Sequence, residues 1–273
     1  MTRMRREHKA VEKHDLEETL SRLPNTAIHA RTLLARLSMI RPLTGDSVIL
    51  DVGAAQGRFL VACAKLGYRA YGIEPWDEAR KMAVRLAEHE GVSIRILAGV
   101  AEQMPFPSEE FDVVHSMSVF EHVQDVQMAF SEAYRVLKPG GVLWFYTASS
   151  ICPVQREIRG FPLFGWYPDR LKRRIMFWAR DNKPHLIGHT EMPAINWFTP
   201  WKARRMLRKA GFGRICDRWS LPRAEGQGRL VHLAFGLIGL CGLTRLCADV
   251  LKPGCAYAAV KEACTVERKD NTV

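Results

Sequence analysis

Short apolar runs and amphipathic runs alternate along the first half of the chain. An apolar run over residues 48–52 leads into a glycine-containing turn, and a helical pattern opens directly after it at Arg58. An apolar run bounded in this way is typical of a buried parallel strand. The predicted elements that follow are, in order, helix 58–66, strand 68–74, helix 77–89, strand 93–97, strand 111–116, helix 125–137 and strand 141–148. This alternation predicts an α/β fold with a doubly wound, mostly parallel sheet.

The flanking segments add elements at both ends of this predicted core. Apolar residues at near-helical spacing predict a capping helix over residues 27–40. Thr199 followed by Pro200 predicts the start of a further helix that ends at Gly211. The last two strands are predicted over residues 213–219 and 255–261.

Composition shifts divide the chain into five predicted parts. Residues 151–200 are rich in proline, arginine and large aromatics, which indicates an inserted lid. Residues 229–251 are mostly apolar and predict a C-terminal helical insertion. The predicted division is 1–46 for a basic leader and capping helix, 47–150 for the core, 151–200 for the lid, 201–265 for the completion of the core with its insertion, and 266–273 for a tail.

The 273 residues carry a formal net charge of +11, which favours anionic partners such as phospholipid surfaces, nucleic acid or phosphorylated substrates. Seven cysteines include no Cys-x-x-Cys pair, so neither a disulfide framework nor a zinc site is indicated. No apolar signal-peptide core follows the basic N-terminus, and the longest uncharged run is shorter than the ~20 residues that span a bilayer. We therefore expect a cytoplasmic protein, with peripheral membrane contact as an open option.

The turn after the first strand carries the most specific chemistry. The segment 51–57 has the pattern Asp-x-Gly-x-Ala-x-Gly, and Glu74 ends the next predicted strand. Glycine permits close backbone approach to a ligand, and the following helix N-terminus presents unpaired N–H groups. The dinucleotide pattern Gly-x-Gly-x-x-Gly would require glycine at Ala55 and Arg58, so a nicotinamide cofactor is disfavoured.

This pattern resembles the first two motifs of class I S-adenosylmethionine-dependent methyltransferases. Four later blocks, at residues 99–106, 111–116, 119–123 and 134–141, are similar in order and spacing to the small-molecule methyltransferases of ubiquinone and menaquinone biosynthesis. The resemblance covers roughly residues 45–150. It implies a seven-stranded Rossmann-like methyltransferase fold whose last two strands are antiparallel, and it implies S-adenosylmethionine as the cofactor.

The resemblance also implies roles for individual residues. Asp51 would hold the methionine ammonium group, the turn would admit the methionine part, and Glu74 would bind the ribose hydroxyls. The family usually has glycine at the position of Ala55. The residues expected to bind the cofactor are Asp51, Gly53, Ala55, Gly57, Glu74, Trp76, Val100, Ala101 and Ser116, with Trp76, Val100 and Ala101 around the adenine ring. Many relatives have aspartate where Val100 stands, so the adenine amino contact is expected to be missing or to move to Glu102.

Methyl transfer from a sulfonium needs positioning more than a catalytic group. An alcohol or phenol acceptor benefits from a general base, and imidazole titrates near neutral pH. His122, which follows the fourth strand, is the first candidate, ahead of His185 and His189 in the lid. A histidine that only fixes the loop is the competing interpretation. In the similar ubiquinone-type O-methyltransferases, a metal has been associated with the pair that corresponds to Glu121 and His122 and with an acidic residue three positions before the glutamate. This chain has Ser118 at that position, so no metal is predicted.

The acceptor is expected to be a hydrophobic or amphiphilic, lipid-like small molecule, methylated at oxygen. Aromatic and basic residues interleave in the lid, which suits a lipid headgroup layer or RNA. The apolar segment 229–251 favours the lipid-like partner over nucleic acid. An RNA methyltransferase and a non-catalytic S-adenosylmethionine-binding protein remain the alternatives.

Overall fold

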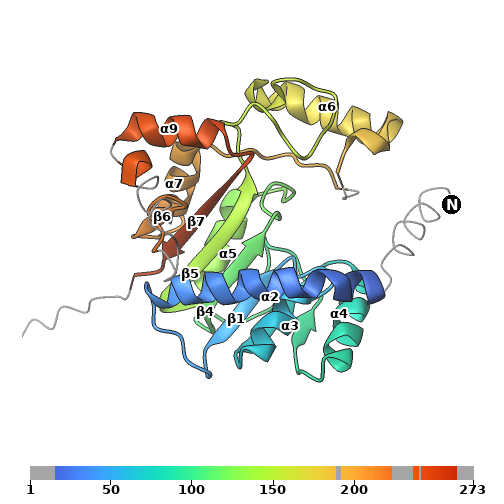
Figure 1. The fold of residues 1–273 in the computed structure, drawn as a ribbon, viewed down its shortest axis with the longest axis vertical. Helices are drawn as coiled ribbons and strands as arrows, with labels where there is room; N and C mark the ends of the chain where they lie inside the picture. Colours follow the sequence, from blue (N-terminus) through green and yellow to red (C-terminus); the bar gives the residue numbers. More distant parts are fainter. Residues whose placement is uncertain (1–15, 189–191, 223–235, 240, 263–273) are drawn as a thin grey trace, which may run out of the picture.

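The computed structural model describes residues 16–188, 192–222, 236–239 and 241–262. Seven strands form one sheet in the order β3-β2-β1-β4-β5-β7-β6 (Figure 1). They are β1 (Val48–Val52), β2 (Arg69–Ile73), β3 (Arg95–Leu97), β4 (Phe111–Met117), β5 (Leu137–Ala148), β6 (Ile215–Asp217) and β7 (Gly254–Val260). β7 runs antiparallel to both of its neighbours, and the remaining pairs are parallel. The predicted doubly wound, mostly parallel α/β fold is therefore confirmed.

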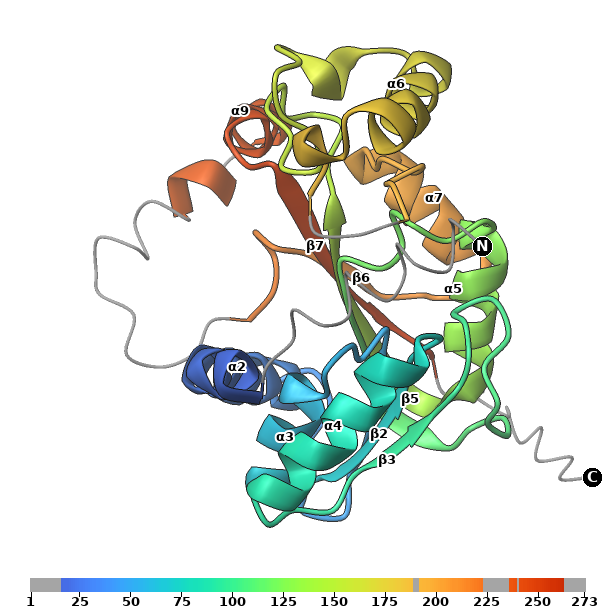
Figure 2. The ribbon, with the colours of Figure 1, turned by 90° about the vertical axis from the view of Figure 1, so that its right-hand side faces the viewer.

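Helices cover both faces of this sheet (Figure 2). α2 (Leu16–Ser38) and α3 (Arg58–Lys65) pack on one face over a core that includes Leu37, Leu60 and Trp144, and α4 (Asp77–His89) lies beside them. α5 (Val126–Val136) and α7 (Pro200–Lys209) pack on the other face. Because β1 and β4 are neighbours while their crossovers lie on opposite faces, the carboxyl ends of these two strands flank the crevice in which such sheets bind ligands.

Two helices, α5 and α7, each begin directly after a residue whose side chain caps the helix N-terminus. The Asp125 side chain accepts a hydrogen bond from the Met128 amide at 3.0 Å, and Thr199 Oγ1 accepts one from the Lys202 amide at 3.2 Å. Such caps satisfy amides that the first helical turn leaves unpaired. The predicted start of the helix after Thr199 is thus confirmed.

The helix before β1 is longer than its predicted span of 27–40. α2 begins at Leu16 and continues through Pro24, which lacks an amide for the bond to residue 20. The helix persists because its apolar face is buried on both sides of the proline, at Leu23 and again at Leu33, Leu34 and Leu37. Tertiary packing here outweighs the local penalty of proline.

The segment between β5 and α7 has a small core of its own. It contains the short helices η1 (Phe164–Trp166) and η2 (Pro184–Leu186) and the longer α6 (Asp169–Asn182). Phe164, Met176 and Trp197 are buried together in this core. In Figure 1, α6 lies beyond the carboxyl end of β5, at the same end of the molecule as α9 (Gly242–Val250). This segment between β5 and α7 is the predicted lid.

The predicted apolar insertion falls partly outside the described residues. Its described portion includes α9, whose Leu243 is 69% exposed, and Leu251 just after that helix is 78% exposed. The basic leader over residues 1–15 and the predicted tail also lie outside the described residues.

Candidate functional site

The turn after β1 takes a backbone course that two of its glycines require. Gly53 has φ of +72°, and a Cβ atom there would lie 2.4 Å from Val119 Cγ2. Gly57 has φ of +73°, and its Cβ would lie 2.6 Å from the Ala83 Cβ. Both positions therefore exclude side chains for two reasons, backbone conformation and lack of space. They let the turn pass close to the β4–α5 connection and to α4.

Ala55 also lies in the left-handed region, with φ of +46°. This explains why glycine would suit the position, because an L-residue there costs roughly 1–2 kcal/mol. The turn is held in this shape from outside, since the Ala55 amide donates to Glu74 Oε2 at 2.9 Å. The exposed Ala55 Cβ meets no obstacle that would exclude the methyl group.

Glu74 joins the glycine turn to the end of β2. Its carboxylate is 5% exposed and accepts amide hydrogen bonds from Ala55 at 2.9 Å and from Trp76 at 3.2 Å, one on each oxygen. Burial raises the pKa of Glu74, and the two amide bonds partly offset that effect. A carboxylate has about four acceptor positions, so two remain for ligand hydroxyls. Two free acceptor positions on one carboxylate fit a ribose, whose vicinal hydroxyl groups can both donate to them.

Asp51 has a protein partner that sequence reasoning did not identify. His115 Nδ1 donates to Asp51 Oδ1 at 2.6 Å, and both side chains are buried. The imidazole of His115 is stacked between Phe59, at 3.7 Å between centroids, and Trp144, at 5.0 Å. The parallel register of β1 and β4 places Asp51 opposite His115. His115 thereby fixes one carboxylate oxygen and leaves the other with acceptor capacity for an ammonium group.

The residues expected around the adenine ring differ in exposure. Trp76 is 51% exposed at the start of α4, and Val100 is 45% exposed in the loop after β3. Ala101 is buried in the main core, next to Val100 in the chain. The Glu102 carboxylate accepts the Gln124 amide at 2.7 Å and thereby joins this loop to the β4–α5 connection.

Ser116 lies on β4 and is fully buried. Its hydroxyl has no hydrogen-bond partner among the residues that the structure describes. It pairs with Val52 in the register of β1 and β4, one step from Asp51 and His115. Ser116 thus stays a prediction at the same end of the same two strands.

His122 lies on the loop after β4 and is mostly buried. Hydrogen bonds to the carbonyl groups of Met192 and Pro193 partly offset the burial that lowers its pKa. Its Nδ1 is buried without a partner among the described residues. A ring whose other nitrogen donates to carbonyl oxygen keeps a free lone pair at Nδ1, which is the state a general base needs. Of the other two candidates, His185 is exposed in η2, and His189 lies outside the described residues.

Glu121, next to His122, is a buried acid that the sequence reasoning gave no role of its own. Burial raises the pKa of Glu121 to about 7, against the effect of the Thr147 hydroxyl that donates to its Oε2 at 2.7 Å. The nearby Glu157, which is partly buried, adds to the rise. Ser118 has φ of +57°, and its amide donates to the Tyr146 carbonyl. Over the described residues no group of three or more His, Cys, Asp or Glu side chains is arranged to hold a metal ion.

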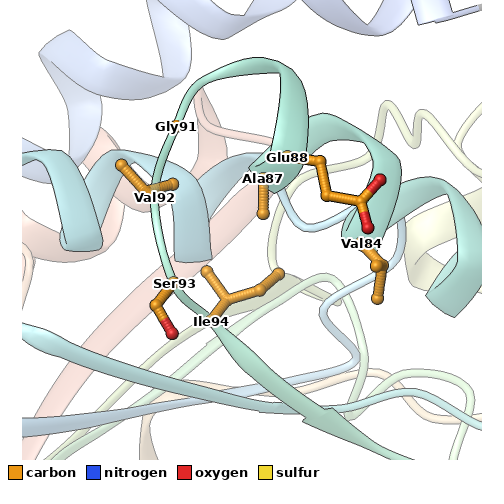
Figure 3. A pocket seen from close by; sticks show the side chains of 7 residues that line it. All are labelled: Val84, Ala87, Glu88, Gly91, Val92, Ser93 and Ile94. Carbon is orange, nitrogen blue, oxygen red and sulfur yellow. The ribbon is translucent and has the colours of Figure 1, made fainter.

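The one hollow drawn in close-up lies elsewhere. It has a volume of about 450 Å³ and is lined by the end of α4 and the loop between α4 and β3, including Glu88 and Ser93 (Figure 3). None of the candidate residues lines it. In the described part of the chain no helix is both long and apolar enough to cross a bilayer.

Comparison with known proteins agrees with this geometry. Residues 50–145 match the family model described as a methyltransferase domain. This part of the chain is therefore similar to a methyltransferase domain. The matched range contains most of β1, the glycine turn, Glu74, β4 and His122.

The chain is similar, over part of its length, to the ubiquinone biosynthesis O-methyltransferase of Paramagnetospirillum magneticum. The two are 40% identical over 105 residues, which is 38% of this chain and 41% of the relative. The match thus spans about two fifths of the curated relative. The whole lid and the C-terminal region lie outside the family match, so the comparison does not assign their roles.

Two solved structures share the fold. The YcgJ protein of Bacillus subtilis has a TM-score of 0.54 at 18% identity, covering 84% of this chain and 98% of that one. Phosphoethanolamine N-methyltransferase 2 of Haemonchus contortus, in complex with S-adenosyl-L-methionine, has a TM-score of 0.54 at 16% identity, covering 84% of this chain and 52% of that one. At this identity the likeness concerns the fold.

Proposed function

We propose that this protein transfers a methyl group from S-adenosylmethionine to an oxygen of a hydrophobic or amphiphilic small molecule. The observation that carries the proposal is the hydrogen bond from the Ala55 amide to Glu74, which builds the glycine turn and the ribose-binding acid into one unit. The similarity to ubiquinone biosynthesis O-methyltransferases supports methylation at oxygen. The lid, which packs beyond β5, would contribute the acceptor side of the site.

Each residue has a defined task in this proposal. S-adenosylmethionine, when bound, supplies an electrophilic methyl group on its sulfonium. The free oxygen of Asp51 holds the ammonium group, and Glu74 holds the ribose hydroxyls. His122 accepts the proton of the acceptor hydroxyl at Nδ1. Holding the methyl donor and the acceptor in line lowers the activation free energy, by about 7–11 kcal/mol in well-oriented intramolecular reactions. Positioning therefore supplies most of the rate enhancement.

Cofactor binding tests the site directly. Glu74→Ala removes both ribose contacts and the acceptor of the Ala55 and Trp76 amides. We therefore expect S-adenosylmethionine to bind at least about 100-fold more weakly, since hydrogen bonds to charged groups contribute about 1.5–3 kcal/mol each. Glu78→Ala, an exposed acid on α4, is the matched control. Isothermal titration calorimetry measures both. Unchanged affinity in Glu74→Ala would refute the assignment of the site.

The class of acceptor is tested by incubating the protein with methyl-labelled S-adenosylmethionine and an extract of its source cells. We expect label in the lipid or organic-soluble fraction. Label in RNA would favour the RNA methyltransferase alternative. Retained cofactor with no transferred label in any fraction would favour the non-catalytic alternative.

Contact with a membrane surface is part of the same proposal. The exposed side of α6 mixes apolar side chains (Leu171, Phe177, Trp178) with arginines (Arg170, Arg174). Aromatic side chains settle at the headgroup level while arginines meet lipid phosphates. We expect the protein to co-sediment with vesicles containing phosphatidylglycerol and to do so at least about tenfold less after Trp178→Glu. Equal sedimentation of the two would contradict this contact.

A further inference from the structure

The last stretch of the lid is buried and tied to the loop that carries His122. Residues 193–198 are all buried, unlike the exposed residues of η2 before them. The amides of Ile195 and Asn196 both donate to the Glu121 carbonyl, at 2.7 and 3.0 Å. A single carbonyl of the β4–α5 loop therefore anchors two successive residues of the lid.

The Asn196 side chain adds a second connection. It is 7% exposed, and its Nδ2 donates to the Val123 carbonyl at 2.7 Å and the Phe120 carbonyl at 3.3 Å. These two carbonyls stand on either side of Glu121 and His122 in the chain. One amide group thereby closes the loop around His122, and it uses both of its hydrogens to do so.

The same asparagine is tied to α6. Arg173 donates from Nε to the Ile195 carbonyl at 2.7 Å and from its terminal nitrogen to Asn196 Oδ1 at 3.3 Å. Three of the four hydrogen-bonding positions of the Asn196 amide are thus used. At the far end of the stretch, the Phe198 amide donates to the Ala148 carbonyl at 3.1 Å, which attaches it to the end of β5.

His122 receives its own contacts from this lid stretch. Its ring is hydrogen-bonded to the carbonyls of Met192 and Pro193, while Nδ1 lies buried without a partner among the described residues. The lid backbone therefore lies against the ring of His122 as well as against the loop that carries it.

We propose that Asn196 is a positioning residue that, by closing the loop from Phe120 to Val123, fixes the orientation of His122. The inference rests on the proposed function for the role of His122 as base, but its structural part does not. It assigns the lid a task besides covering the acceptor. Asn196 itself contacts neither cofactor nor acceptor.

The test uses the full chain with S-adenosylhomocysteine as the probe ligand. Nitrogen-15 NMR of the histidine rings reports the tautomer, and His122→Gln identifies the signal of His122. The parent protein should show a single tautomer, as expected for a ring that is held in one orientation. Asn196→Asp, which has the same shape but replaces a donor by an acceptor, should show a mixture of tautomers. Amide exchange at Ile195 should accelerate at least about tenfold, as expected for losing hydrogen bonds of about 1.5 kcal/mol.

Two further variants keep the test decisive. Asn182→Asp changes an exposed asparagine of α6 that donates to the Trp178 carbonyl, and it should leave the His122 signal unchanged. If Asn196→Asp does not fold, Arg173→Gln removes the connection to α6 and should produce the same change in a smaller amount. A single unchanged tautomer in the folded variants would overturn the inference. Full methyl transfer by His122→Gln would instead overturn the role of His122 as base and leave the positioning inference standing.

Discussion

Gly57→Ala tests how closely the glycine turn is fitted to α4. The new methyl group would lie 2.6 Å from the Ala83 Cβ and 3.1 Å from its Cα, and neither atom can move without moving α4. Overpacking of this kind costs about 1–3 kcal/mol. The left-handed φ of +73° adds about 1–2 kcal/mol for a residue with a Cβ. We therefore expect Gly57→Ala to lower the free energy of unfolding by about 2–5 kcal/mol.

A double-mutant cycle separates the two contributions. Ala83→Gly opens the space that the new methyl group needs, at a cost of about 1 kcal/mol for glycine in a helix. The double variant should recover the packing part of the loss and keep the backbone part. The coupling free energy between the two sites should therefore be about 1–3 kcal/mol, measured by urea unfolding with linear extrapolation to water.

The cycle has an outcome that would refute the reasoning. Additive losses, with a coupling below about 0.5 kcal/mol, would mean that residues 57 and 83 do not compete for the same space. In that case the requirement for Gly57 would come from its backbone conformation alone.

Two other predictions concern the same turn and its neighbours. Ala55→Gly removes the left-handed strain, so the free energy of unfolding should rise by up to about 1 kcal/mol after the entropy of glycine is subtracted; a loss of stability in urea unfolding would contradict this. His115→Phe keeps the stacking against Phe59 but leaves the buried Asp51 carboxylate without its donor, so we expect a loss of about 3 kcal/mol at pH 7. Asp51→Asn combined with His115→Phe should restore part of that loss, and a double variant no more stable than His115→Phe would contradict the pairing.

Local patterns were sufficient to predict the central elements. α4 begins at Asp77 and ends at His89 as predicted, because its apolar spacing repeats over several turns with acids in the first turn. The strands were located to within a few residues, since each is a short apolar run bounded by turn residues. The antiparallel position of β7 came from the resemblance to a family, because nothing in its own sequence specifies a direction.

Contacts between distant segments could not be predicted in the same way. The pairing of Asp51 with His115 depends on the register of two strands that are 64 residues apart. Asn196 looks like an ordinary polar residue in a proline-rich segment, and its role depends on three carbonyl or guanidinium groups brought to it by the fold. The left-handed backbone at Ala55 was only indicated by comparison with glycine in relatives. Site residues that act through neighbours therefore need the structure.

Two groups, the partly buried His29 and the buried Glu121, give the stability of this protein opposing pH dependences. Burial, and then the proximity of His115, lowers the pKa of His29 to about 4. Above the unfolded-state pKa of about 6.5, this histidine is neutral in both states and does not lower the free energy of unfolding. As pH falls from 6.5 toward 4, the unfolded state takes up the proton first, so the free energy of unfolding decreases. Burial raises the pKa of Glu121 to about 7, so this acid has the opposite sign: it costs nothing below about pH 4.5 and destabilises the fold as pH rises through 7.

Removing each group should therefore change the pH profile in a predictable direction. Glu121→Gln should be more stable than the parent at pH 8, by roughly 1–3 kcal/mol, and about equal to it at pH 4.5, because the amide keeps an acceptor for Thr147 and carries no charge. His29→Leu should flatten the decline between pH 6.5 and 4, while His89→Leu, at an exposed histidine, serves as control. Urea unfolding across pH 4–8 measures both. A Glu121→Gln profile parallel to that of the parent would show that Glu121 is ionised in the fold as readily as in water, and that its burial against Thr147 is lost in solution.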